Sequence, residues 1–139
     1  MTDDPRLGVS VTHRRYVPYA HAHYAGDLVD GAWGLGLFGD VATEMCIRTD
    51  GDEGLFASYS DVQFGAPVRA GDVVEVEATV TRVGTRSREL ALLARVVCRG
   101  AAAASGDPTA EPSAAVVLDP PIVAVTAVGT VVVPVASTT

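Results

Sequence analysis

The sequence predicts an α+β fold in which one curled antiparallel β-sheet wraps around a single long buried α-helix. The glycine-rich segment at residues 27–48 is apolar nearly all the way round, which is typical of a helix enclosed by protein. After residue 54 the hydrophobic period changes from helical to two, as in strands with one wet face. No second long helical segment separates these strands, so an antiparallel meander is expected rather than parallel strands with crossovers.

The expected elements follow one another in a single domain of 139 residues. We expect strands at residues 7–17, 55–64, 73–83, 87–98 and 122–133, and the helix at residues 28–46. Residues 100–121 are rich in alanine, proline and glycine, and are expected to be a long, partly mobile loop with a flexible insertion at about 100–117. The expected inner faces of the third and fourth strands are Val74, Val76, Ala78 and Val80, and Leu90, Leu92, Ala94, Val96 and Cys98.

Composition narrows the classes of function. The formal net charge of −7 disfavours nonspecific nucleic-acid binding. All ten basic residues are arginine, and the absence of lysine excludes Schiff-base chemistry and a Walker-type phosphate loop. Cys46 and Cys98 stand in apolar surroundings, which favours reduced thiols. No segment has the pattern of a signal peptide or a membrane span, so a cytoplasmic protein that does not bind membranes is expected.

Two carboxylates on the apolar helix are the first candidates for chemistry. Asp40 and Glu44 lie one turn apart on one helical face, and packing alone does not require them. The alternative is that both lie at an exposed end of the helix, with Glu44 paired to Arg48 at i,i+4.

Arginines form a second pattern. They cluster in and around the third and fourth expected strands, at Arg82, Arg86, Arg88, Arg95 and Arg99, and such a group could hold a phosphorylated ligand through bidentate contacts. On spacing alone, a solvated strand face is at least as good an interpretation.

Several segments carry a family resemblance. The segment DVQFGAPVRAGDVVEVEA at residues 61–78 and the turn after Val83 resemble hotdog-fold acyl-CoA enzymes. Three others narrow the match: HYAGDLVDGA at 23–32, LFGDVATE at 37–44 and DGDEGLF at 50–56. Together they resemble the hotdog-fold 3-aminobutyryl-CoA and β-alanyl-CoA ammonia lyases.

The resemblance implies reversible addition of ammonia across the 2,3-double bond of an enoyl-CoA, with no prosthetic group and with coenzyme A as part of the substrate. It also implies a homodimer or an assembly of dimers, with the thioester between subunits. On this reading Glu44 shuttles the proton and Asp40 holds the ammonium group, or the reverse. Backbone N–H groups near the helix start would stabilise the enolate oxygen, and Gly31 would let the carbonyl approach. The other substrate-binding candidates are His23, Tyr24, Asp27, Asp30 and Trp33, and the coenzyme A candidates are Arg86, Ser87 and Arg88.

Other functions remain open at this point. A thioesterase or an enoyl-CoA hydratase could use the same fold, and a non-catalytic acyl-CoA-binding subunit is the alternative outside enzymes. Aligning residues 26–31 with the helix start of acyl-CoA hydrolases places Phe38 where those enzymes carry a catalytic aspartate.

Three motifs are interpreted as coincidental. The glycine pattern at 34–39 lacks the strand–turn–helix context of a dinucleotide site. The Ala-Ser-Gly sequence at 104–106 lies in a low-complexity segment. His13, His21 and His23, with Asp27, fit no standard zinc spacing, so no metal is expected.

Overall fold

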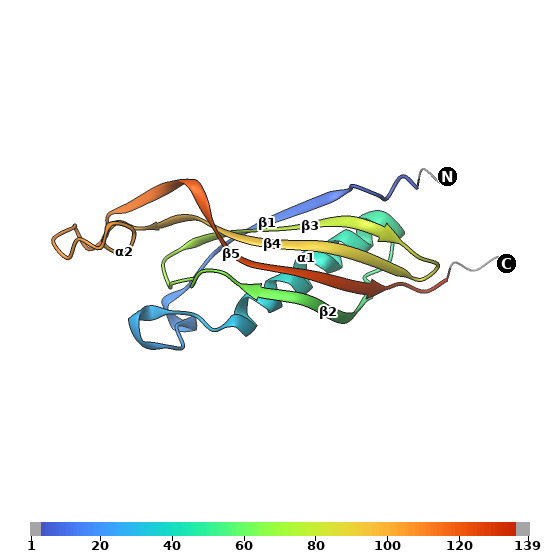
Figure 1. Ribbon diagram of the computed structural model, residues 1–139, viewed down its shortest axis with the longest axis horizontal. Coiled ribbons are helices and arrows are strands. Elements are labelled where there is room, and N and C mark those ends of the chain that lie inside the picture. The colour runs from blue at the N-terminus through green and yellow to red at the C-terminus, as the bar shows by residue number, and fades with distance from the viewer. Residues whose placement is uncertain (1–3, 136–139) are drawn as a thin grey trace.

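The structure is a computed structural model that describes residues 4–135. A five-stranded antiparallel sheet with one long helix across it forms the fold (Figure 1). The strand order is β1-β3-β4-β5-β2, so β1 and β2 are the edges. The strands are β1 (Ser10–Tyr16), β2 (Leu55–Phe64), β3 (Val73–Val83), β4 (Ser87–Gly100) and β5 (Ala115–Val132), and the long helix is α1 (Gly31–Asp50). The short elements are η1 (Tyr19–His21), η2 (Ala25–Asp27) and α2 (Ala101–Ser105). Within the described residues, no helix is long and apolar enough to cross a membrane.

The helix begins and ends later than the expected residues 28–46. Asp30 caps its N-terminus, since its side chain accepts a hydrogen bond from the backbone N–H of Trp33. At the other end Gly51 adopts a left-handed conformation with φ of 66° and its N–H donates to the carbonyl of Ile47, a common C-terminal signal. The expectation of a helix buried on every side is wrong for the single chain, because α1 exposes one face: Ala32, Gly36, Asp40, Thr43, Ile47 and Arg48.

The core lies between the helix and the inner face of the sheet. The predicted alternation in β3 is confirmed, because Val74, Val76, Ala78 and Val80 are all buried there. In β4 the pattern holds as far as Val96. Two β4 residues then oppose one residue of β3, and this bulge reverses the alternation. Cys98 is therefore only half-buried, contrary to the prediction, and Arg99 turns inward instead.

The prediction of a long loop at residues 100–121 is wrong in part. β4 continues to Gly100 and β5 begins at Ala115, so the two strands pair as far as Gly100 and Ala115. Helix α2 connects them, and the three elements project from one end of the molecule (Figure 1). The backbone hydrogen bonds of paired strands explain why this alanine-rich stretch is not simply a loop.

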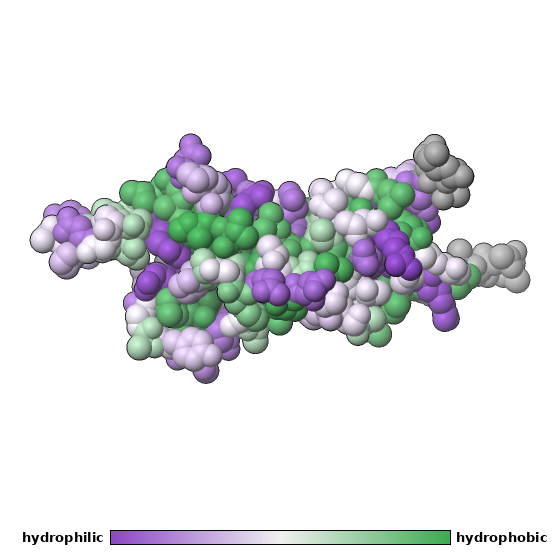
Figure 2. All heavy atoms as spheres, viewed as in Figure 1, coloured by the Kyte–Doolittle hydropathy of each residue, from purple (hydrophilic) through white to green (hydrophobic). Residues whose placement is uncertain are grey.

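Apolar side chains also remain on the surface. Figure 2 shows extensive hydrophobic surface, in green, on one face of the single chain. Large exposed apolar residues on β2 and β5 include Leu55, Phe64, Val117 and Val123. Exposed apolar surface of this kind on strands is typical of a contact with another protein chain.

Candidate active site

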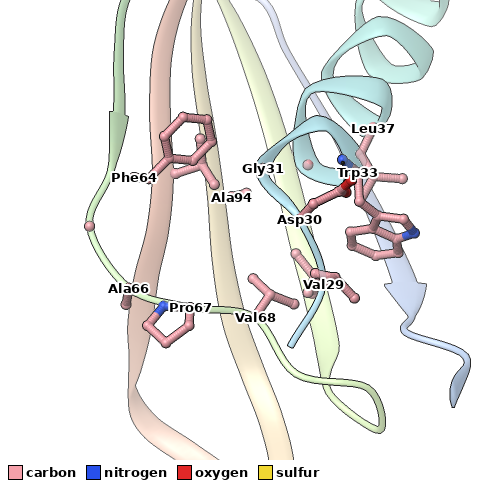
Figure 3. Close-up of a pocket in the computed structure, with 14 residues that line it drawn as sticks. Val29, Asp30, Gly31, Trp33, Leu37, Phe64, Ala66, Pro67, Val68 and Ala94 are labelled. Atoms are coloured by element: carbon pink, nitrogen blue, oxygen red, sulfur yellow. Dashed lines mark hydrogen bonds between the residues drawn. The ribbon is translucent and has the colours of Figure 1, made fainter. Parts of the chain in front are cut away.

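An apolar cavity of about 360 Å³ lies against the N-terminus of α1. Its floor is made by small and medium side chains of three neighbouring strands, Val74, Ala94 and Val125. The first two turns of the helix form one wall (Figure 3). The segment from Phe64 to Val68, which connects β2 to the start of β3, forms the opposite wall.

The helix start approaches this opposite wall closely. A Cβ atom added at Gly31 would lie 2.6 Å from Cε1 of Phe64, so only glycine allows the ring to rest there. The backbone N–H groups at the beginning of a helix have no intrahelical acceptor and carry the positive end of the helix dipole. The cavity therefore joins an apolar lining to hydrogen-bond donors that suit a partially negative oxygen.

A buried ion pair holds the wall segment in place. Asp72 is 0% exposed and accepts two hydrogen bonds from Arg99, from Nε at 3.0 Å and from Nη2 at 2.9 Å. Arg99 Nη2 also donates to the carbonyl of Pro67, and Asp72 accepts from the backbone N–H of Arg69. The wall is linked to the helix entrance as well, because Val29 N–H donates to the carbonyl of Val68 at 3.0 Å.

The structure brings Asp30, Gly31 and Trp33 to the cavity, as lining residues. His21, which sequence reasoning considered only as a metal ligand, accepts a hydrogen bond at Nδ1 from Trp33 Nε1 at 2.8 Å. His21 thus fixes the indole ring that borders the cavity.

The other predicted substrate contacts lie on the loop before the helix. His23, Tyr24 and Asp27 are exposed and do not line the cavity of the single chain. The His23 and Tyr24 rings meet edge to face with centroids 4.6 Å apart. Asp27 has φ of 60°, and Arg69 Nη1 donates to the carbonyl of the preceding Gly26. The loop is therefore held next to Arg69, which directly follows the wall segment.

Asp40 and Glu44 do not line the cavity either. Asp40 is exposed, whereas Glu44 is fixed between two partners. Glu44 Oε2 accepts from Arg48 Nε at 2.7 Å, and its Oε1 lies 2.8 Å from His13 Nε2. The Arg48 guanidinium, followed by His13, holds the pKa of the Glu44 carboxyl below its ordinary value of 4.5. In the single chain, the Glu44–Arg48 pair matches the alternative given above, in which Glu44 pairs with Arg48 at the helix surface.

The predicted coenzyme A residues are at the other end of the helix. Arg88 is only 3% exposed, and its guanidinium donates hydrogen bonds to the Asp50 carboxylate and to the carbonyls of Gly84 and Ser87. Its contacts leave it no free face for a phosphate. Arg86 is exposed beside a second hollow of about 450 Å³, which Asp52 and Glu53 also line. Ser87 is half-buried at the start of β4.

The motifs interpreted as coincidental lie in different elements of the structure. The glycine pattern at 34–39 lies inside α1 rather than at a strand–helix turn. Ser105 ends α2 and donates to the carbonyl of Ala101. In the described part of the chain, no three histidine, cysteine, aspartate or glutamate side chains gather as a metal site would require.

Sequence reasoning missed Phe64 and Ala94 as cavity residues. Phe64 closes a predicted strand for which no inner face was predicted, whereas Ala94 belongs to a predicted inner face and was therefore expected to serve packing. The signal available was the Gly-Ala-Pro sequence after Phe64, which ends the strand. The ring of this last strand residue lies against Gly31 at the helix start.

Comparisons with known proteins bear on this site. A family model described as the thioesterase superfamily matches residues 31–95, from the helix start to the floor of the cavity. The 3-aminobutyryl-CoA ammonia lyase of Acetoanaerobium sticklandii is 51% identical over 113 residues, which are 81% of this chain and 85% of that protein. The chain belongs to the 3-aminobutyryl-CoA ammonia lyase family.

Solved structures agree with this family and with the predicted hotdog fold. The β-alanyl-CoA:ammonia lyase of Clostridium propionicum is 33% identical with a TM-score of 0.82, over 91% of this chain and 86% of that chain. A hexameric thioesterase from Yersinia pestis is 20% identical with a TM-score of 0.68, over 91% and 88% of the two chains, and shows the fold alone. Phe38, which the match of residues 26–31 to the hydrolase helix start places at the aspartate position, is completely buried. The helix therefore offers no acid at that position.

Proposed function

We propose that this protein interconverts a short-chain 3-aminoacyl-CoA, such as 3-aminobutyryl-CoA, with the corresponding 2-enoyl-CoA and ammonia. The observation that carries the proposal is the 51% identity to a 3-aminobutyryl-CoA ammonia lyase over most of both chains. The cavity agrees with such a substrate, because its volume of about 360 Å³ and its apolar lining suit a short acyl chain.

The helix start supplies one of the requirements of the reaction. In the elimination, the Cα–H electron pair becomes the new double bond, and the C–N pair leaves with ammonia. The Cα proton passes to a carboxylate and ends on ammonia as ammonium. Negative charge develops on the thioester oxygen as the proton leaves. The backbone N–H groups of Gly31 and Ala32 are the donors at the helix start that can stabilise this oxygen.

The proton-shuttling role of Glu44 stays a prediction, as does the partnership of Asp40 with it. Both face away from the cavity of their own chain, so these roles need a second chain whose cavity they approach. An oligomer would supply it, and we propose at least a homodimer with the thioester between subunits. The exposed apolar residues of edge strand β2 support such an assembly.

The proposal includes coenzyme A only as part of the substrate, and no prosthetic group. Arg86 is exposed and is the remaining arginine of the predicted coenzyme A residues that can reach a phosphate. Neither nucleic acid nor a membrane is a proposed partner. We propose a cytoplasmic location, where Cys46 and Cys98, both free thiols, stay reduced.

A thioesterase is the competing function, since the superfamily model carries that description. The purified protein is incubated with crotonyl-CoA and ammonium, while the enoyl absorbance, free thiol and aminated product are followed together. The proposal expects loss of the enoyl absorbance with formation of 3-aminobutyryl-CoA and no thiol release. Thiol release without amination would assign a thioesterase, and binding without turnover would assign an accessory subunit.

A further inference from the structure

The substrate of the proposed reaction brings a positive charge into an apolar cavity. The 3-ammonium group sits on the carbon next to the one that loses its proton, so it must enter the cavity with the acyl chain. Burying an unpaired cation among apolar side chains is strongly unfavourable, and a carboxylate is the partner that compensates it best. The residue that supplies this carboxylate decides which acyl-CoA the site prefers.

Asp30 is the one residue with an ionisable side chain among the 14 that line the cavity. It comes directly before Gly31, at the end of the wall that the helix start forms (Figure 3). The remaining lining residues are glycine, proline and apolar side chains, so they present no other negative charge to a ligand.

The carboxylate of Asp30 is fixed through one oxygen. Oδ1 accepts the backbone N–H of Trp33 at 3.1 Å, which is an N-terminal helix cap. Within residues 4–135, nothing donates a hydrogen bond to Oδ2, and no arginine or histidine pairs with Asp30. One oxygen therefore orients the group and the other remains for a ligand. By contrast, Glu44 uses both oxygens on Arg48 and His13.

We propose that Asp30 binds the 3-ammonium group of the substrate through Oδ2. Asp30 then selects aminoacyl-CoA over unsubstituted acyl-CoA, in place of the ammonium-holding role first predicted for Asp40. The inference rests on the proposed function, since it takes its ligand from that reaction. The helix cap and the ammonium site are one side chain, which places the cation directly beside the donors for the thioester oxygen.

The test compares two probes that differ only in the amino group, 3-aminobutyryl-CoA and butyryl-CoA. Asp30→Asn and Asp30→Ser both keep a good helix cap but remove the charge. We expect each variant to bind 3-aminobutyryl-CoA about 10- to 100-fold more weakly, because a hydrogen bond to a charged group is lost. Butyryl-CoA should bind as to the wild type. The affinity is taken from KM where the variant turns the probe over, and from equilibrium titration where it does not.

Asp107→Asn is the matched control, because Asp107 also accepts a backbone N–H, that of Thr109 at 2.9 Å, and lines neither hollow. It should bind both probes as the wild type does. Unchanged preference in Asp30→Asn, equal weakening of both probes, or loss of preference in Asp40→Asn or Glu44→Gln instead would each overturn the inference. A wild type that binds 3-aminobutyryl-CoA but fails to aminate crotonyl-CoA would refute the proposed function and leave the ammonium site standing.

Discussion

The ring of Phe64 lies on Gly31, so close that an added Cβ would come within 2.6 Å of the ring edge. This contact joins the last residue of β2 to the first residue of α1. It shapes the entrance of the cavity and explains why a glycine, a weaker helix former than alanine, stands at the helix start.

Gly31→Ala should therefore weaken acyl-CoA binding while leaving the fold intact. The new methyl group displaces the Phe64 ring and crowds the donors for the thioester oxygen. Isothermal titration with butyryl-CoA measures the loss, and Gly31→Ala combined with Phe64→Ala should recover much of it. Gly36→Ala is the control, because a Cβ there meets nothing within 4 Å. Wild-type affinity in Gly31→Ala would show that the contact does not shape the site.

The Asp72–Arg99 pair should matter for both stability and binding. Removing one partner of a buried ion pair costs about 3–5 kcal/mol, so Asp72→Ala should lower the free energy of unfolding in urea by roughly this amount. KM for the acyl-CoA should rise, because the Pro67 carbonyl loses its link to an anchored Arg99. Surface Arg14→Ala is the comparison, since Arg14 is exposed and its ion pair with Glu75 lies outside the cavity. Equal, small effects in both variants would contradict this role.

The Glu44 pairings predict a dependence of stability on pH. Its pKa is lowered in the folded state, so its stabilisation is present above the ordinary value of 4.5 and is lost as the pH falls through the lowered pKa. Glu44→Gln should therefore destabilise the protein at pH 7 and have less effect at about pH 3. Urea unfolding at both pH values measures this difference, and Glu53→Gln, at an exposed position, provides the control. An equal effect at both pH values would exclude the ionised pairing.

The cavity floor should set the length of the acyl chain. Ala94 is buried and lines the cavity, so Ala94→Val should reduce kcat/KM for a six-carbon enoyl-CoA more than for crotonyl-CoA. Ala78→Val is a matched control, because Ala78 is buried in the neighbouring strand but does not line the cavity. Both changes overpack the core at a cost of about 1–3 kcal/mol, and only the first should change the ratio between the two substrates. An unchanged ratio in Ala94→Val would show that the acyl chain does not lie against Ala94.

The sequence predicted those parts of the fold that depend on local pattern. The inner face of β3 follows from strict alternation, and β2 from its composition between two turns. The inward direction of Arg99 and its ion pair could not be predicted, because a bulge after Val96 reverses the direction of the side chain and the partner Asp72 is 27 residues away. The site was predictable as far as the helix start, where Asp30 and Gly31 were expected to meet the substrate, although the capping role of Asp30 was not predicted. Phe64 reaches it only through the tertiary fold.

The most direct measurement follows heavy nitrogen from labelled ammonium into the thioester product. Wild-type protein with crotonyl-CoA and labelled ammonium should form 3-aminobutyryl-CoA that carries the label at C3 and still carries coenzyme A, as mass spectrometry would detect. Release of free coenzyme A with crotonic acid, and no label in any thioester, would contradict the ammonia lyase assignment.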